Sequence, residues 1–310
     1  MRIVVTGGAG FVGLQVSRML VDRGHEVTVF SRTPSEKRLG DLNGRVSAVA
    51  GDVGNFSHVL DLVKAAKPEV IYHLGAMLSV PSDADPAAAI QTNAMGTFYV
   101  LEAARLFDVR QVVFSSSVAT YGSGLGKGDV DDWSLQRPTL FYGATKVFGE
   151  HMGLVYKRKY GLDFRGIRYP SVVGPGVATP GVAQYTSKVI EAAMAGKTFA
   201  IWVEPDSKVA LMSLKDAARA TVELAEAPVD AIKTVNYLVD GAKPTPTAGE
   251  IAEKVRARFQ GAGITFEPDP VIAPIMRRQH ELNDSAARTE WGWQPRQDYD
   301  AIIDDFVSDS

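Results

Sequence analysis

The chain has 310 residues, of which 45% are hydrophobic and 22% are charged, and its formal net charge is −3. These values are those of an ordinary globular protein, and the lack of a basic run argues against a nucleic-acid partner. Cysteine is absent and the five histidines do not have metal-ligand spacing, so disulfides and thiolate metal sites are excluded and no metal is expected.

No apolar run in the sequence approaches the roughly 18 residues that a membrane span requires. The first residues lead directly into a short apolar run, without the basic segment, apolar segment and cleavage site of a secretory leader. We therefore expect a cytoplasmic protein with no membrane partner.

Short apolar runs alternate with longer segments of helical periodicity over the first two thirds of the chain. This order is typical of βαβ units, so we expect an α/β fold, a doubly wound parallel sheet of the Rossmann type with helices on both faces. The runs predict strands at residues 3–6, 26–31, 46–50, 70–74, 111–115 and 163–168. The segments between them predict helices at about residues 11–23, 56–66, 86–107 and 141–160.

The pattern loosens after about residue 168, where proline and glycine are frequent. Further helices are predicted near residues 182–195, 214–227 and 248–259, with a short helix at the end of the chain. We expect residues 1–170 to form the Rossmann domain. Residues 171–310 are expected to form mainly a small carboxyl-terminal substrate-binding lobe that is interleaved with the sheet.

A glycine-rich turn follows the first predicted strand and precedes the first predicted helix, with glycines at Gly7, Gly10 and Gly13. In a dinucleotide-binding turn, the first glycine allows the tight bend, the second lets the backbone approach the pyrophosphate, and the third lets the helix pack on the strand. The amino terminus of the helix, with Phe11 and Val12, supplies N–H donors for the anion. The turn therefore predicts a dinucleotide site, in preference to a purely structural bend.

The second predicted strand ends in Ser31 and Arg32 instead of the acidic residue that binds the ribose 2′-hydroxyl in an NAD site. A guanidinium pairs bidentately with phosphate, so these residues suit a 2′-phosphate. NADP is therefore the preferred cofactor. NAD stays open, because Arg32 can also be a solvated residue at the start of a loop.

Two other segments follow predicted strands at the same edge of the sheet. Asp52 and Val53 come after the third strand, where an adenine is expected, and Asp52 can either accept from the adenine amino group or cap its own loop. Leu74, Gly75 and Ala76 end the fourth strand, where small residues leave room for the middle of the cofactor. Both segments are assigned to the cofactor site.

Tyr142 and Lys146 are four residues apart, so on a helix they project from one face. A tyrosine has an ordinary pKa of about 10, and a lysine charge held nearby lowers that pKa by favouring the phenolate. Tyr142 then becomes a proton acceptor near neutral pH. Such pairs also occur on exposed helices without any function, so the pair needs support from elsewhere in the chain.

That support comes from the fifth predicted strand, which runs out into Ser115-Ser116-Ser117 and is followed by Tyr121-Gly122. A serine at this edge can hydrogen-bond a reacting oxygen beside the tyrosine. With the glycine-rich turn, the Tyr-x-x-x-Lys helix and Asn93 in the preceding long helix, the sequence resembles the extended short-chain dehydrogenase/reductases over nearly its whole length. Ser115 and Ser116 are left as cofactor-side or structural residues.

The resemblance implies roles for individual residues. Ser117 orients the substrate oxygen, Tyr142 transfers the proton, and Lys146 binds the nicotinamide ribose and tunes Tyr142. Asn93 helps to hold a water in the proton relay, although an asparagine that only bridges helix and strand gives the same pattern. Tyr169, after the sixth strand, is assigned to the cofactor site.

Within the family, the chain is most similar to the short-chain L-threonine dehydrogenases and the sugar-acid dehydrogenases, in residues 75–79, 166–170 and 284–293. Ser171 stands where sugar-nucleotide epimerases carry an asparagine, and residues 182–183 are Val-Ala where threonine dehydrogenases often carry two threonines. These departures argue against a nucleotide sugar and against threonine itself. We expect a small polar hydroxy acid or sugar-derived substrate, contacted by Ser79, Ser117, Tyr142, Ser171, Gln184 and Tyr185.

The expected activity is hydride transfer between the nicotinamide and a secondary alcohol of this small molecule. One alternative is a redox-neutral epimerase or dehydratase with tightly bound NAD, and another is a non-catalytic NADP-sensing module, which has no use for Ser117, Tyr142 and Lys146. Family members pair through the two long helices, so a homodimer is expected. The apolar Phe98, Val147 and Val155 suit that pairing and also a monomer core.

Overall fold

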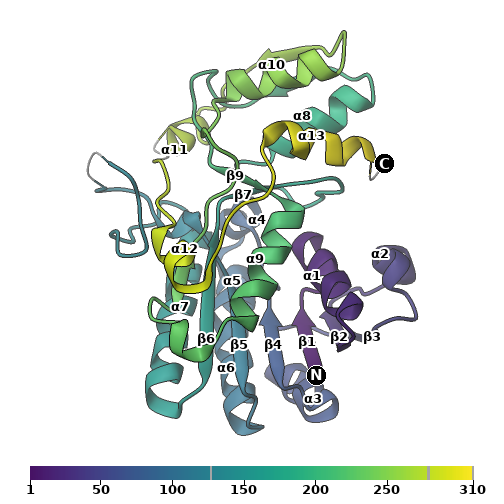
Figure 1. The fold of residues 1–310 in the computed structure, drawn as a ribbon, viewed down its shortest axis with the longest axis vertical. Helices are drawn as coiled ribbons and strands as arrows, with labels where there is room; N and C mark the ends of the chain where they lie inside the picture. Colours follow the sequence, from purple (N-terminus) through teal and green to yellow (C-terminus); the bar gives the residue numbers. More distant parts are fainter. Residues whose placement is uncertain (126–127, 278–279, 309–310) are drawn as a thin grey trace.

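The computed structural model describes residues 1–125, 128–277 and 280–308. Seven parallel strands form the central sheet, in the order β10-β6-β5-β4-β1-β2-β3 (Figure 1). This order confirms the doubly wound parallel sheet expected from the sequence. The strands are β1 (Arg2–Thr6), β2 (Glu26–Ser31), β3 (Ser47–Ala50), β4 (Val70–His73), β5 (Gln111–Ser117), β6 (Asp163–Tyr169) and β10 (Asn236–Leu238).

The burial of the strands follows their apolar runs. Every residue of β4 is buried, and β5 is buried over its first four residues, because helices cover both faces of the sheet. The edge strand β3 is exposed along its whole length. In the centre of the sheet, β5 and β6 pair in a register that places Ser117 opposite Tyr169. The register brings both side chains to the carboxyl edge of the sheet.

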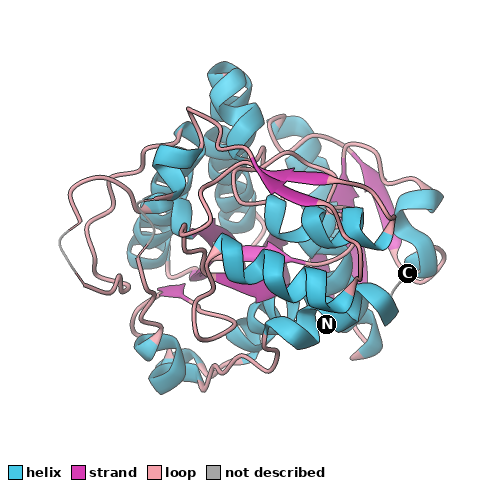
Figure 2. Cartoon of the chain, turned by 90° about the horizontal axis from the view of Figure 1, so that it is seen from above, coloured by secondary structure: helices cyan, strands magenta, loops and turns pink. Residues whose placement is uncertain are grey.

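Helices cover the two faces of the sheet, and Figure 2 shows the strands enclosed between them. On one face α1 (Phe11–Asp22) packs against α9 (Leu214–Glu226), and on the other α6 (Gly96–Leu106) lies between α3 (Phe56–Ala66) and α7 (Phe141–Tyr160). The two faces have separate hydrophobic clusters, one containing Val16 and Leu20 and the other containing Phe114 and Phe164.

The helix predicted at residues 86–107 is present but is not uniform. It consists of α5 (Pro86–Ala89), a π-helical segment (Ile90–Met95) and α6. A π-helical turn inserts an extra residue and changes the direction in which side chains point. The segment carries Asn93, which is turned inward and buried.

A smaller lobe lies above the sheet in Figure 1, on the side where the parallel strands end. Tyr185, Val189, Ile251 and Phe306 belong to its core, which is one hydrophobic cluster. The lobe helices are α8 (Tyr185–Met194), α10 (Ala248–Arg258), α11 (Ala273–Met276) and α13 (Tyr299–Ser308). Two pairs of short strands accompany them: β7 (Ser171–Val173) with β9 (Leu211–Ser213), and β8 (Phe199–Ile201) with β11 (Ile264–Phe266).

Two elements from the later part of the chain pack with the sheet instead of with the lobe. The strand β10 extends the sheet beside β6, and the helix α9 covers it beside α1. Within the described ranges, no helix is long and apolar enough to cross a membrane. The remaining short helices are α2 (Glu36–Leu39), α4 (Ser79–Ala84), α12 (Ser285–Trp291) and the 3-10 turns Gly40–Leu42, Val118–Thr120 and Val229–Ala231.

Candidate active site

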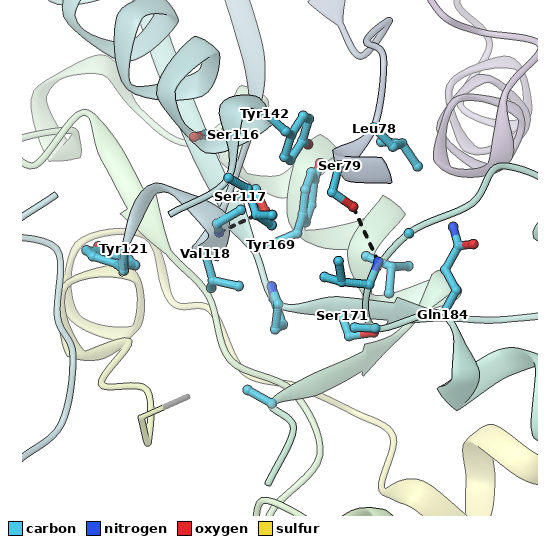
Figure 3. A pocket seen from close by; sticks show the side chains of 18 of the residues that line it. Leu78, Ser79, Ser116, Ser117, Val118, Tyr121, Tyr142, Tyr169, Ser171 and Gln184 are labelled. Atoms are coloured by element: carbon cyan, nitrogen blue, oxygen red, sulfur yellow. Dashed lines mark hydrogen bonds between the residues drawn. The ribbon is translucent and has the colours of Figure 1, made fainter. Parts of the chain in front are cut away.

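A cavity of about 320 Å³ lies between the carboxyl edge of the sheet and the lobe. Figure 3 shows side chains that line it, with Tyr142, Ser117 and Tyr169 near its centre and Ser79 close by. Its walls come from the start of α1, the ends of β4, β5 and β6, the start of α7, and the loops and helix α11 of the lobe. This is where ligands bind in open α/β sheets.

The glycine-rich turn is shaped by close backbone contacts. Gly7 has a φ of +69°, and a Cβ atom there would lie 2.6 Å from the Cα atom of Gly75. A Cβ atom on Gly13 would lie 2.1 Å from the carbonyl oxygen of Gly7, so helix α1 can approach the turn only with glycine at this position. Gly10 caps α1 without a side-chain hydrogen bond. The first N–H groups of α1 are therefore free to bind an anion.

Ser117 and Tyr142 line one side of the cavity, whereas Lys146 is buried beside Tyr142 and does not line it. A hydrogen bond between the Ser117 and Tyr142 side chains favours the ionised phenol. The Lys146 ammonium donates to the carbonyl oxygen of Ser115 at 2.5 Å and lies 5.5 Å from the centre of the Tyr142 ring. The three side chains that the resemblance assigned to the chemistry are thus brought together.

The approach of helix α7 to the end of β5 depends on Gly143. A Cβ atom on Gly143 would lie 2.0 Å from the carbonyl oxygen of Ala119, which is far closer than atoms approach in proteins. Ala119 also donates its backbone N–H to the Ser117 hydroxyl at 3.1 Å. Glycine at this position therefore sets the distance between Tyr142 and Ser117.

Burial dominates the electrostatics of the pair. It raises the pKa of Tyr142 above its ordinary value, and the hydrogen bond from Ser117 only partly opposes this. It also lowers the pKa of Lys146 to about 7, against the opposing charge of Glu150. Lys146 is not among the causes of the shift in the pKa of Tyr142 in the protein without cofactor, so the tuning of Tyr142 by Lys146 stays a prediction for the protein with its cofactor.

Asn93 does not line the cavity. Its side-chain oxygen accepts from the Met77 N–H at 2.8 Å, and its nitrogen donates to the Met77 carbonyl at 3.0 Å and to the Thr145 hydroxyl at 3.1 Å. These bonds tie the segment after β4 to helix α7, one residue before Lys146. The geometry supports the bridging alternative for the Asn93 side chain over the water relay.

The predicted cofactor residues fall into three groups: those that line the cavity, those beside the glycine-rich turn and Tyr142 that do not line it (Gly7, Gly10, Gly13, Gly75 and Lys146), and those at the adenine end. Five of them line the cavity: Phe11, Val12, Leu74, Ala76 and Tyr169. Gly75 lies against Gly7, and the Tyr169 hydroxyl is hydrogen-bonded to Thr221. The four residues predicted at the adenine end, Ser31, Arg32, Asp52 and Val53, lie outside this cavity.

The adenine-end residues have clear local roles. The Ser31 hydroxyl accepts from the Ala9 N–H at 3.1 Å, and Arg32 is exposed at the end of β2. Asp52 accepts from the Gly54 N–H at 2.8 Å, so it caps its own loop, as the second reading of that residue allowed. Val53 is buried.

Besides Ser117 and Tyr142, four residues were predicted to contact the substrate: Ser79, Ser171, Gln184 and Tyr185. Ser79, Ser171 and Gln184 line the cavity, and the Ser79 hydroxyl accepts from the Val182 N–H at 3.3 Å. Tyr185 does not line it, so the prediction that Tyr185 contacts the substrate is wrong. Helix α8 begins at this residue and turns its side chain into the lobe core, where the ring packs edge-on against Trp202.

A buried ionic cluster below the serines was not predicted. Arg168 on β6 donates to both carboxylate oxygens of Glu150 on α7, at 2.8 and 2.7 Å, and to the Tyr121 hydroxyl at 2.8 Å. Glu150 also accepts from the Ser116 hydroxyl at 2.5 Å. In the sequence, a glutamate one turn after Lys146 looks like an exposed helix residue, so no signal pointed to its burial.

Sequence reasoning also missed most of the cavity wall, which is apolar. The wall includes Leu78, Val118, Leu125, Val130, Leu140, Val172, Val177, Val182, Ile275, Met276 and Leu282. Aliphatic residues in loops carry no motif, and those after residue 270 reach the site only through the fold. Within the described ranges, no group of three or more acidic or histidine side chains is placed to hold a metal ion.

Comparison with known proteins agrees with this geometry. The model of the NAD dependent epimerase/dehydratase family matches residues 3–239. The mitochondrial L-threonine 3-dehydrogenase of Sus scrofa is 30% identical over 301 residues, which cover 94% of this chain and 78% of that protein. The holo form of an L-threonine dehydrogenase from Cupriavidus necator superposes with a TM-score of 0.92 at 25% identity, covering 100% of this chain and 99% of that one.

A structure of UDP-glucose 4-epimerase from Thermotoga maritima, with UDP-glucose, shares the fold as well. Its TM-score is 0.88 at 22% identity, and the match covers 100% of this chain and 99% of that one. The fold is therefore common to dehydrogenases and epimerases, and the side chains of the cavity must distinguish between these reactions.

Proposed function

The chain belongs to the NAD dependent epimerase/dehydratase family, and on that premise we propose that it transfers a hydride between the nicotinamide of NAD(P) and a secondary alcohol carbon of a small molecule. The observation that carries the proposal is the placement of Ser117 and Tyr142 in the wall of a cavity that adjoins the glycine-rich turn, with Lys146 buried beside the Tyr142 ring.

The residues of the turn and the cavity fit a nicotinamide dinucleotide. Helix α1 begins without a side-chain cap, so its first N–H groups can hold a pyrophosphate. Phe11, Val12, Leu74 and Ala76 give the adjoining wall an apolar surface suited to a flat ring. When bound, the cofactor supplies the hydride acceptor or donor and, in its oxidised form, a positive charge that favours the phenolate of Tyr142.

In the direction of oxidation, the substrate loses the proton of its hydroxyl group and a hydride from the carbon that bears this group. It thereby becomes a ketone. Ser117 holds the reacting oxygen by a hydrogen bond, and the phenol oxygen of Tyr142 receives the proton. Lys146, anchored on the Ser115 carbonyl, can bind or release a proton near neutral pH because burial lowers its pKa to about 7. In the reverse direction Tyr142 returns the proton to the ketone oxygen.

We propose NADP as the preferred cofactor, with NAD as the alternative. Arg32 stands exposed at the end of β2, and within the described part of the chain no ion pair joins it to a carboxylate. A free guanidinium at this position suits the 2′-phosphate of NADP. The family itself is described as NAD dependent, so the two cofactors must be compared directly.

The cavity gives no support to the redox-neutral alternative with a nucleotide sugar. A nucleotide diphosphate requires cationic partners, and no lysine or arginine is found among the described residues that line the cavity. A sensing module has no need for a buried lysine beside a tyrosine that faces a cavity. Both features favour a dehydrogenase.

We also propose that the protein is a homodimer and that the two parts of the chain bind different ligands. Phe148, Leu154 and Val155 expose large apolar side chains on α7, which is one of the two helices predicted to pair. Residues 1–170 would bind the dinucleotide, and residues 171–310 would supply most of the substrate contacts. Light scattering of the purified protein tests the dimer.

The function is tested by following absorbance at 340 nm with NAD+ and NADP+ in parallel against a panel of secondary alcohols. The proposal predicts reduction of the cofactor by at least one member of the panel. A silent panel, together with NAD(H) that is released only when the protein is denatured, would support the redox-neutral alternative instead.

A further inference from the structure

The cavity has two chemically different sides around Ser117. In Figure 3, Val118 and Tyr121 lie to one side of Ser117, and Ser79, Ser171 and Gln184 lie to the other. The first side is aliphatic and aromatic, whereas the second carries hydroxyl and amide groups beside the aliphatic Leu78. A substrate held with its reacting oxygen on Ser117 therefore meets a different surface in each direction.

The apolar side is built from segments that are far apart in the sequence. Val118, Leu125 and Leu282 are partly buried and pack on the cluster formed by Tyr121, Val130 and Leu238. We call the four cavity-lining aliphatic members the apolar patch: Val118, Leu125, Val130 and Leu282. Residues 130 and 282 also form a β-bridge, so backbone pairing holds these two members of the patch next to each other.

The polar side offers neutral hydrogen-bonding groups. The Ser79 hydroxyl accepts from the Val182 N–H and keeps its own proton to donate, and the Ser171 hydroxyl lies 3.3 Å from that of Thr186. The side-chain oxygen of Gln184 is buried and has no hydrogen-bond partner in the protein. This oxygen is closed off from the cavity as well as from solvent, so it is the amide nitrogen of Gln184 that can donate to a polar group on the ligand.

Formal charge is missing from the wall as far as the structure describes it. The described lining residues include no aspartate, glutamate, lysine or arginine, and His280 is the one imidazole among them. A carboxylate moved from water into such a cavity would lose its hydration and find no lysine or arginine among the described lining residues. The small hydroxy acid expected from the sequence therefore fits this wall poorly.

We propose that the substrate is an uncharged secondary alcohol, or the matching ketone, with an alkyl or aryl arm on one side of the reacting carbon and a neutral hydroxyl or amide group on the other. The arm packs on the apolar patch, and the neutral polar group bonds to Ser79, Ser171 and Gln184. This inference rests on the proposed hydride transfer and names the class of compound that undergoes it.

The test compares matched compounds with the same reacting carbon, followed at 340 nm with the intact enzyme and the better of the two cofactors. The neutral compounds are 3-hydroxybutanamide, 3-hydroxyhexanamide and 3-hydroxy-3-phenylpropanamide, and the charged ones are the three corresponding carboxylates. We expect kcat/KM for each amide to exceed that for its carboxylate by at least about 30-fold, the effect of one uncompensated buried charge. We also expect kcat/KM to rise roughly fourfold for each methylene added to the arm.

Three variants test which side of the cavity contacts the arm of the substrate and which side contacts its polar group. Leu125→Ala should remove most of the gain in kcat/KM that the longer arm brings. Leu135→Ala is the matched control, since Leu135 is an exposed leucine on the same loop that does not line the cavity. Gln184→Leu should raise KM for the amides about tenfold while changing kcat less.

The possible failures are distinguishable. Carboxylates turned over as well as the amides, or a longer arm that lowers kcat/KM, would overturn the substrate class and leave the hydride transfer intact. No turnover of any compound, with cofactor binding confirmed by quenching of tryptophan fluorescence, would count against the hydride transfer and this inference together. Equal effects of Leu125→Ala and Leu135→Ala would overturn the assignment of the arm to the apolar patch.

Discussion

The ammonium nitrogen of Lys146 lies 5.5 Å from the centre of the Tyr142 ring, on the same face of helix α7. It is also 4.8 Å from the centre of the Phe114 ring, and its hydrogen bond to the Ser115 carbonyl fixes it against the end of β5. Lys146 is therefore a buried amino group held by a carbonyl oxygen and two aromatic faces. Burial and neighbouring groups therefore affect its protonation state more strongly than they affect the protonation state of an exposed lysine.

The first prediction concerns stability and pH. The pKa of Lys146 is about 7 in the folded protein, below its ordinary value of 10.5, so between these pH values the unfolded chain binds a proton that the folded chain does not. Stability due to this group therefore rises with pH from about 7 to 10.5, by up to about 1.4 kcal/mol per pH unit. Lys146→Met should remove that slope in urea unfolding of the cofactor-free protein. Parallel curves for parent and variant would contradict the lowered pKa.

The second prediction concerns the choice of cofactor. Arg32→Ala should raise KM for NADP about tenfold or more, because a charge-assisted hydrogen bond to the 2′-phosphate is lost. KM for NAD should stay within about twofold. Arg158→Ala, which removes an exposed arginine at the far end of α7, serves as the control. An equal loss with both cofactors would show that Arg32 does not read the 2′-phosphate.

The third prediction concerns the distance between α7 and the end of β5. Gly143→Ala places a methyl group 2.0 Å from the Ala119 carbonyl oxygen, so the helix must move away from Ser117. We expect kcat to fall by about 100-fold or more, since a displacement of about 1 Å at a reacting group has that effect. Ala144→Ser, on the exposed side of the same turn, should retain activity. Unchanged kcat in the Gly143 variant would refute the role of this contact.

The fourth prediction concerns the buried pair of Glu150 and Arg168. Glu150→Gln leaves the buried guanidinium without its carboxylate, and we expect a loss of about 3–5 kcal/mol in the free energy of unfolding. Asp304→Asn breaks the exposed pair with Arg258 and should cost less than about 1 kcal/mol. Urea unfolding measures both. Similar losses in the two variants would mean that burial does not strengthen the Glu150 pair.

The sheet was predictable because its strands are short apolar runs of ordinary length. The predicted bounds of the strands around Val29 and Val113 differ from the observed ones by at most two residues. The strand β10 was missed because its three residues, Asn236–Leu238, have no periodicity of their own and join the sheet only by pairing with β6. The π-helical segment was missed for a similar reason, since its sequence reads as an ordinary helix and its shape depends on the contacts of Asn93.

Site residues were predictable where a fixed spacing in the sequence sets their arrangement. They were unpredictable where contacts between distant parts of the chain set it. Tyr142 and Lys146 meet because they are one helical turn apart, and the glycines of the first turn follow a fixed pattern. Leu125 and Leu282 are more than 150 residues apart in the chain but pack on the same cluster beside the cavity. No local sequence pattern predicts that contact. Tyr185 was wrongly assigned to the substrate site together with its neighbour Gln184. Helix α8 begins at Tyr185, and the sequence does not show that this start turns the two side chains in different directions.

The most direct test of the account is the Tyr142→Phe variant, measured for both turnover and cofactor binding. Removal of one hydroxyl leaves the ring packing and the glycine-rich turn in place, so the dissociation constant of the reduced cofactor should stay within about threefold of the parent. The account predicts that kcat falls by about 100-fold or more, the usual contribution of a positioned proton donor or acceptor. Turnover that survives in the phenylalanine variant would contradict the assignment of proton transfer to Tyr142.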